Sequence, residues 1–142
     1  MIIADTRGLL AAFGYDLRWH REAKAAYDAD SGPVIMSPFV LAELDYLMLA
    51  RAGVERELEL LREVAAGVFE LAGFGSADMV EAASVAARYK DMRIGLADAS
   101  IVVLAARYRT TRLLTLDERH FRAIKPLHAD AFELLPADGA VD

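Results

Sequence analysis

The sequence predicts an α/β fold in which a mostly parallel sheet of about five short strands is covered by helices on both faces. Short apolar runs alternate with amphipathic helical patterns along the chain, as in strands joined by helical crossovers. The 142 residues, 56% of them hydrophobic, are enough for one well-buried core. No repeat, linker or low-complexity tract divides the chain. We therefore expect a single domain over residues 1–142, with a frayed tail from Pro136 to Asp142.

The predicted strands are short apolar runs bounded by turn residues or acids. In chain order they are Met1–Ala4, Val34–Met36, Val68–Leu71, Arg112–Leu116 and Asp130–Leu135. Two of them are followed directly by an acid, Asp5 after the first and Asp117 after the fourth. Ligands of parallel sheets gather beyond the carboxyl ends of the strands, so both acids are candidate site residues. Each could instead simply cap the helix that follows it.

The predicted helices lie between these strands. They are Thr6–Phe13, Asp16–Ala29, Pro38–Arg51, Val54–Ala66, Ala77–Lys90, Gly95–Tyr108 and a short turn, Glu118–Ala123. Ser37 and Pro38 form a strong start signal, because Ser caps a helix and Pro suits its first position. We expect Ser76 to cap the fifth helix in the same way.

Asp98 lies in the first turn of a helix that is apolar along most of its length. Ile101 and Val102, three and four residues on, place it on an apolar face. The dipole of the helix alone could account for Asp98, with a stabilisation of roughly 0.3–1 kcal/mol. The alternative is that Asp98 belongs to an acidic cluster that holds a cation.

Two further acids, Glu43 and Asp45, interrupt the apolar helix that starts at Pro38. They point about 200° apart around the helix axis, so only one can face a given site. Periodicity does not choose between them. An unpaired carboxylate buried on such a helix would be costly, which indicates a function unless an Arg pairs with it.

Asp5, Asp98, Asp117 and one acid of the Pro38 helix together predict a pocket of four carboxylates. Two carboxylates about 5 Å apart repel by roughly 3 kcal/mol at an effective dielectric near 20, so such a cluster takes up protons or a cation. The chain has no Cys, and we assign no role to His20, His120 or His128, which lack metal-like spacing. Oxygen ligands favour Mg²⁺ or Mn²⁺, and either ion could promote hydrolysis of a phosphodiester.

Charge and hydropathy indicate what the chain could bind and in which compartment it acts. The net charge is -6, yet the segment Arg88–Lys125 carries nine Lys or Arg against four acids. This segment is either a set of solvated helix faces or a basic rim that steers a phosphate backbone to the acids. The longest uninterrupted apolar run, Ile101–Ala106, is too short to span a membrane. Together with the absence of Cys, this predicts a cytoplasmic protein without a targeting or membrane segment.

Four segments of the chain resemble the four acidic motifs of the PIN-domain family, particularly its VapC-type toxins. They are Ile2–Thr6, Pro38–Leu44, Gly95–Ser100 and Leu114–Phe121. Their order and spacing are kept over essentially the whole chain. The resemblance implies a PIN-like α/β/α sandwich and a Mg²⁺- or Mn²⁺-dependent endoribonuclease. It also assigns the catalytic and metal-binding positions, which are Asp5, Glu43, Asp98 and Asp117, with Thr115 as a polar residue of the same site. This resemblance, and not periodicity, selects Glu43 over Asp45.

The same resemblance implies partners. They are an RNA substrate, a second copy of the chain in a homodimer, and a cognate VapB-like antitoxin whose C-terminal segment covers the pocket of a type II toxin. Arg7 departs from the family pattern, which often has a small residue there, and it could grip a phosphate or crowd the site.

Two alternatives stay open. A catalytically weak RNA- or protein-binding module would fit the presence of Arg7. A phosphatase or phosphotransferase with an aspartyl nucleophile is disfavoured, because Asp5-Thr6-Arg7 lacks a second acid two residues after Asp5.

Overall fold

A computed structural model of the chain describes residues 1–139. Its centre is a five-stranded sheet in the order β3-β2-β1-β4-β5, and every neighbouring pair is parallel. The strands are β1 (Ile2–Ala4), β2 (Val34–Met36), β3 (Glu70–Leu71), β4 (Arg112–Leu114) and β5 (Glu133–Leu135). The predicted α/β fold with a parallel sheet is confirmed.

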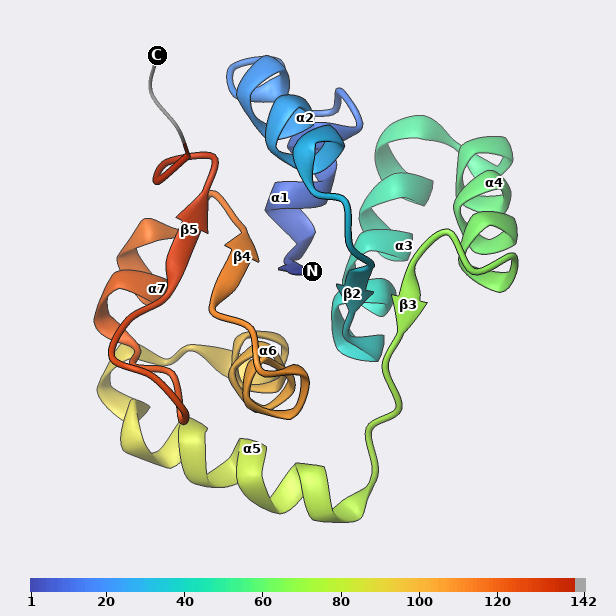
Figure 1. Cartoon of the computed structure of the whole chain (residues 1–142). Helices are drawn as coiled ribbons and strands as arrows, with labels where there is room; N and C mark the ends of the chain where they lie inside the picture. The colour runs from blue at the N-terminus through green and yellow to red at the C-terminus, as the bar shows by residue number, and fades with distance from the viewer. Residues whose placement is uncertain (140–142) are drawn as a thin grey trace.

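Helices cover the sheet in two layers (Figure 1). They are α1 (Thr6–Ala12), α2 (His20–Ala29), α3 (Pro38–Ala52), α4 (Val54–Ala65), α5 (Ser76–Arg88), α6 (Gly95–Tyr108) and α7 (Glu118–Ala123), with a 3₁₀ turn, η1, at Lys90–Met92. Helices α1 and α2 lie over one face of the sheet, and α5 and α6 lie under the opposite face (Figure 1). The α3–α4 hairpin stands beside β2 and β3, while α7 lies beside β5 (Figure 1). No helix within residues 1–139 is long and apolar enough to cross a membrane.

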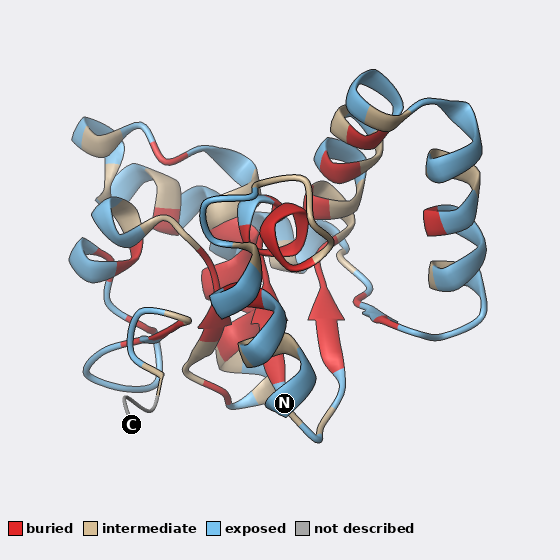
Figure 2. Cartoon of the chain, turned by 90° about the horizontal axis from the view of Figure 1, so that it is seen from above, coloured by how far each residue is buried: buried red, intermediate tan, exposed pale blue. Residues whose placement is uncertain are grey.

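Burial explains the apolar composition of the inner elements (Figure 2). Strands β1 and β2 are buried along their whole length, because helices cover both faces of a parallel sheet. Helix α6 is buried from Ala99 to Ala105, which accounts for its lack of a polar face. Helix α4 is mostly exposed, and Leu60 is its buried residue.

Gly8 brings the start of α1 directly onto the end of β4. A Cβ atom at this position would lie 2.2 Å from the carbonyl oxygen of Leu114, so the close approach requires Gly. The backbone N–H of Asp5 donates to the same carbonyl at 3.0 Å. The residue that follows β1 is thereby fixed beside the residues that follow β4.

The start of α3 agrees with the prediction from the sequence, whereas the cap of α5 and the start of α2 differ from it. Ser37 caps α3 as expected, since its Oγ accepts the Phe39 N–H at 3.1 Å. Ser76 does not cap α5; it is the first helical residue, and the Asp78 carboxylate instead accepts the Gly75 N–H at 2.9 Å. Helix α2 begins at His20, not Asp16. The ring Nδ1 of His20 lies 2.8 Å from the Ala11 carbonyl, so the chain turns back onto α1 before the helix starts.

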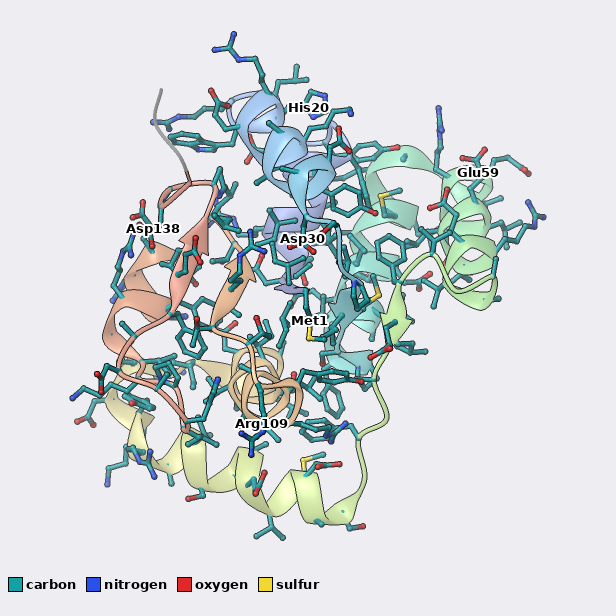
Figure 3. All side chains as sticks on the ribbon, viewed as in Figure 1. Met1, His20, Asp30, Glu59, Arg109 and Asp138 are labelled. Carbon is teal, nitrogen blue, oxygen red and sulfur yellow. The ribbon has the colours of Figure 1, made fainter. Side chains whose placement is uncertain are left out.

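The chain after β5 is held more firmly than we expected. Residues 136–139 form a turn in which the Asp138 carboxylate accepts the Leu134 N–H at 2.8 Å and pairs with Arg122 at 2.6 Å. Asp138 thus ties this turn to α7 (Figure 3). The expected fraying from Pro136 is therefore wrong for these four residues, and the rest of that prediction, residues 140–142, lies outside the described residues.

Candidate active site

The predicted acids meet at the point where the strand order reverses. From β1 the chain proceeds outward to β2 and β3, and it then returns to place β4 on the other side of β1. Parallel sheets bind ligands in the crevice at such a point, beyond the carboxyl ends of the strands. Asp5 follows β1, and Thr115 follows β4.

Asp5 is both a helix cap and a buried acid. Its Oδ1 accepts the Gly8 N–H at 2.7 Å, and its Oδ2 accepts the Thr115 hydroxyl. The pKa of Asp5 is raised to about 7, chiefly by burial and also by the nearby charges of Asp98 and Asp117, against the opposing effect of these two hydrogen bonds. The cap and the cluster are therefore not exclusive explanations of Asp5, since the structure shows both.

Thr115 connects the ends of β1 and β4. Its hydroxyl donates to Asp5 and accepts the Asp117 N–H at 2.9 Å. Strand β4 ends at Leu114, so the predicted strand to Leu116 is too long and Asp117 does not directly follow it. Asp117 instead caps α7, with its Oδ1 accepting the His120 N–H at 3.0 Å.

His120 joins the acids, although the sequence analysis assigned it no role. Its ring Nδ1 lies 2.8 Å from Oδ2 of Asp98 and 3.1 Å from Oδ2 of Asp117. A signal for this contact was present, because His120 stands three residues after Asp117 in the same helical turn, where side chains are neighbours. We overlooked this signal because we compared the three His residues only with one another, and their spacing is not typical of a metal site.

Asp98 is half-buried in the first turn of α6 and faces the other acids. Burial raises the pKa of Asp98, although the His120 hydrogen bond and charge oppose this effect. The charges of Asp117 and Glu43 add to the rise. These contacts indicate that Asp98 is part of the cluster as well as a residue at the positive end of a helix dipole.

The two acids of α3 point to different neighbours. Glu43 lies beside Asp98 in the same pocket, but it is exposed, so the expectation of a buried acid on this helix is wrong for Glu43. The carboxylate of Asp45 lies near Glu57 of α4 instead, where it raises the pKa of Glu57, and Oδ1 of Asp45 is buried without a hydrogen-bond partner among the described residues. Only Glu43 of the two therefore lies with the other acids, because α3 packs on α4 along one side and borders the pocket along the other.

We call this cleft of about 200 Å³ the acid pocket; it is lined by Asp5, Arg7, Glu43, Asp98 and Asp117. Ligand atoms of Asp98, Asp117 and His120 lie within 4.8 Å of one another. Nδ1 of the His120 ring lies between the two carboxylates and contacts both of them. The donor set of several carboxylates and one imidazole fits a small divalent cation whose remaining ligands are waters.

The comparisons with known proteins agree with this geometry. The family model of the PIN domain matches residues 2–126. The chain belongs to the PIN-domain family. Ribonuclease VapC26 of Mycobacterium tuberculosis (strain ATCC 25618 / H37Rv) is 46% identical to this PIN domain over 135 residues, which are 95% of this chain and 100% of the relative. The crystal structure of Mycobacterium tuberculosis VapC20, a sarcin-ricin loop cleaving toxin, has a TM-score of 0.79. It is 18% identical and covers 92% of this chain and 99% of that chain, so it supports the fold.

Only some of the cations in the basic segment Arg88–Lys125 are free to form the expected basic rim around the acids. Arg107 pairs with Asp78, Arg112 with Asp30, and Arg122 with Asp138, which uses these cations within the fold. Lys90 and Arg93 are exposed at η1, immediately before Ile94 and Gly95, which line the acid pocket. The expected attraction of a phosphate backbone therefore concerns these and other exposed cations, and not the whole segment.

Proposed function

We propose that this PIN domain is a divalent-cation-dependent endoribonuclease and the toxin of a toxin–antitoxin pair. The observation that carries the proposal is the convergence of Asp5, Glu43, Asp98 and Asp117 in one pocket, in a chain that is 46% identical to a protein named as a ribonuclease. The four acids come from separate parts of the chain, and a bound cation would relieve their mutual repulsion.

Asp98 and Asp117 would hold the cation, with Asp5 and Glu43 completing the negative wall of the acid pocket. A divalent cation in this position supplies Lewis-acid activation of water and neutralises charge that develops on the phosphate. Thr115 fixes the Asp5 carboxylate through its hydroxyl and fixes the Asp117 backbone through the N–H that it accepts. These hydrogen bonds hold the acids in place before substrate arrives, as electrostatic catalysis requires.

Mg²⁺ and Mn²⁺ both suit the carboxylates, and His120 adds a reason to favour Mn²⁺. A ring nitrogen of His120 could join Asp98 and Asp117 as a ligand once it released its hydrogen bond to these carboxylates, and imidazole is a better ligand for Mn²⁺ than for Mg²⁺. We therefore expect activity with both ions and tighter binding of Mn²⁺.

The proposed partners are RNA, a VapB-like antitoxin and a second copy of the chain, and we propose that the protein acts in the cytoplasm. Exposed apolar side chains on the α3–α4 hairpin support a protein partner. Tyr46 is 70% exposed, and Leu49, Val54 and Leu61 are also exposed. An exposed apolar patch of this kind is typical of a surface that another protein covers.

The test is cleavage of total RNA by the purified, antitoxin-free chain in Mg²⁺, in Mn²⁺ and in EDTA. We expect cuts that require the cation and that disappear in Asp98→Asn and Asp117→Asn. Asp45→Asn is the matched control, since it removes an acid of the same kind that faces α4 and should leave cleavage unchanged. Absence of cleavage under every condition by a folded sample would contradict the nuclease and favour a binding module.

A further inference from the structure

A second hollow adjoins the acid pocket on the side of α2. It has a volume of about 340 Å³, and we call it the Trp19 hollow; its wall includes Arg7, Trp19, Glu22, Thr115 and Glu118. Arg7 lines both this hollow and the acid pocket, and Thr115 donates to Asp5. The two spaces are therefore neighbours that share the Arg7 side chain as a common wall.

The hollow is formed where several segments meet. The loop before α2 and the first turn of α2 supply one side, and the turn after β5, at Pro136 and Ala137, supplies the other. Figure 1 shows this turn and α2 at the same end of the molecule. The volume falls within the range of about 300–1,000 Å³ that is usual for small-ligand sites.

Trp19 gives the hollow an aromatic surface. It is the single Trp of the chain and is 40% exposed, although it is the largest apolar side chain available to the core. The Arg18 guanidinium lies 5.3 Å from the ring centroid, in a cation–π contact that supports the ring. Exposed aromatic rings beside a cationic group are typical of sites that stack single-stranded bases.

The charged groups of the hollow are arranged for a base and its phosphate. Glu22 and Glu118 line the hollow but not the acid pocket, and they repel phosphate but can accept hydrogen bonds from the amino groups of bases. The guanidinium of Arg122 contacts Glu118 at 3.0 Å, which restrains that carboxylate. Arg7 is exposed at the boundary between the two spaces, where a phosphate that links adjacent nucleotides would pass.

We propose that the Trp19 hollow binds an unpaired RNA base next to the phosphate held at the acid pocket. The base stacks on Trp19, its exocyclic amino group donates to Glu22 or Glu118, and Arg7 contacts the intervening phosphate. Bases with an exocyclic amino group are therefore preferred over uracil. This inference deepens the proposed function and rests on it for the identity of the polymer.

Binding at the hollow can be followed by tryptophan fluorescence, because Trp19 is the single Trp of the chain. The full chain is titrated in EDTA with the trinucleotides UUU and UAU, so that binding is measured without cleavage. We expect quenching, tighter binding of UAU than of UUU, and loss of this difference in the double variant Glu22→Ala, Glu118→Ala, which removes both acceptors. Leu17→Ala is the matched control, since Leu17 is 85% exposed nearby and should leave both titrations unchanged. Absence of quenching by either trinucleotide would overturn the inference, as would equal quenching by both.

Cleavage kinetics give an independent test. Trp19→Ala should raise KM for RNA by about 5- to 150-fold, the usual effect of removing one stacked base, with kcat changed far less. Trp19→Phe should restore KM to within a few-fold of the unaltered chain, because a phenyl ring still stacks. An unchanged KM in a folded Trp19→Ala variant would overturn the inference.

The two tests separate this inference from the proposed function. If the chain shows base-selective quenching but cleaves no RNA, the nuclease proposal fails and the base site stands. If the chain cleaves RNA while Trp19 neither quenches nor affects KM, the nuclease stands and the base site fails. A protein partner that occupied the hollow in place of RNA would produce that second pattern.

Discussion

Replacing Asp5 by Asn should stabilise the cation-free protein above pH 7 and leave its stability almost unchanged near pH 4.5. Burial raises the pKa of Asp5 from 3.8 to about 7 in the folded chain. Between these values the folded protein holds a proton that the unfolded chain releases. The stability of the unaltered protein therefore falls as the pH rises through this window, and the whole penalty is present above pH 7.

The expected size follows from the structure. The difference between the two pKa values corresponds to at most about 4 kcal/mol of unfolding free energy, at 1.36 kcal/mol for each pKa unit. Asn retains the oxygen that accepts the Gly8 N–H, and it is as good an N-cap as Asp. The Thr115 hydroxyl loses its carboxylate acceptor, which costs about 1 kcal/mol. We therefore expect a gain of about 2–3 kcal/mol at pH 8 and almost no difference at pH 4.5, where the unaltered protein already bears a penalty of about 1 kcal/mol that offsets the lost hydrogen bond.

Urea unfolding in EDTA, followed by circular dichroism from pH 4.5 to pH 8, measures this difference directly. Asp91→Asn is the control, because Asp91 is exposed and its replacement should leave the pH profile unchanged. Parallel profiles for Asp5→Asn and the unaltered protein over the whole range would refute the reasoning, since they would mean that Asp5 titrates alike in the folded and unfolded chains.

Two further changes test the packing that positions the site. Thr115→Val should lower the unfolding free energy by about 2 kcal/mol, because it removes the buried hydroxyl that bonds both Asp5 and the Asp117 N–H. Thermal unfolding measures this loss, and an unchanged Tm would contradict it. Gly8→Ala should lower the unfolding free energy by about 3 kcal/mol, because the new Cβ would lie 2.2 Å from the Leu114 carbonyl oxygen. Urea unfolding measures this loss, and a free energy equal to that of the unaltered chain would mean that α1 does not approach β4 so closely.

The fold was largely predictable from local patterns. Short apolar runs such as Ile2–Ala4 and Val34–Met36 identified strands, and Ser37-Pro38 identified the start of α3. The order of the strands was not predictable, because every strand of a covered parallel sheet is apolar on both faces and its pairing depends on distant partners. The start of α2 was missed because His20 bonds a carbonyl of the preceding helix, which is a tertiary contact.

The site was predictable in part. Asp5 and Asp98 stood out because acids at a strand end and at the start of an apolar helix need an explanation. Glu43 and Asp45 were equivalent by periodicity, and only the packing of α3 against α4 separates them. The contact of His120 with Asp98 was not predictable, because the two residues are 22 positions apart in sequence; its contact with Asp117, three positions before it, was the one local signal.

Titration of the full chain with Mn²⁺ at pH 8 is the most direct test of whether these acids form a divalent-cation site. Free Mn²⁺ is followed by electron paramagnetic resonance, so the result does not depend on knowing the RNA target. We expect saturable binding that is at least about 10-fold weaker in Asp98→Asn and in Asp117→Asn, and unchanged in Asp45→Asn. Equal Mn²⁺ affinity in the unaltered chain and in Asp98→Asn would contradict a cation site at these acids.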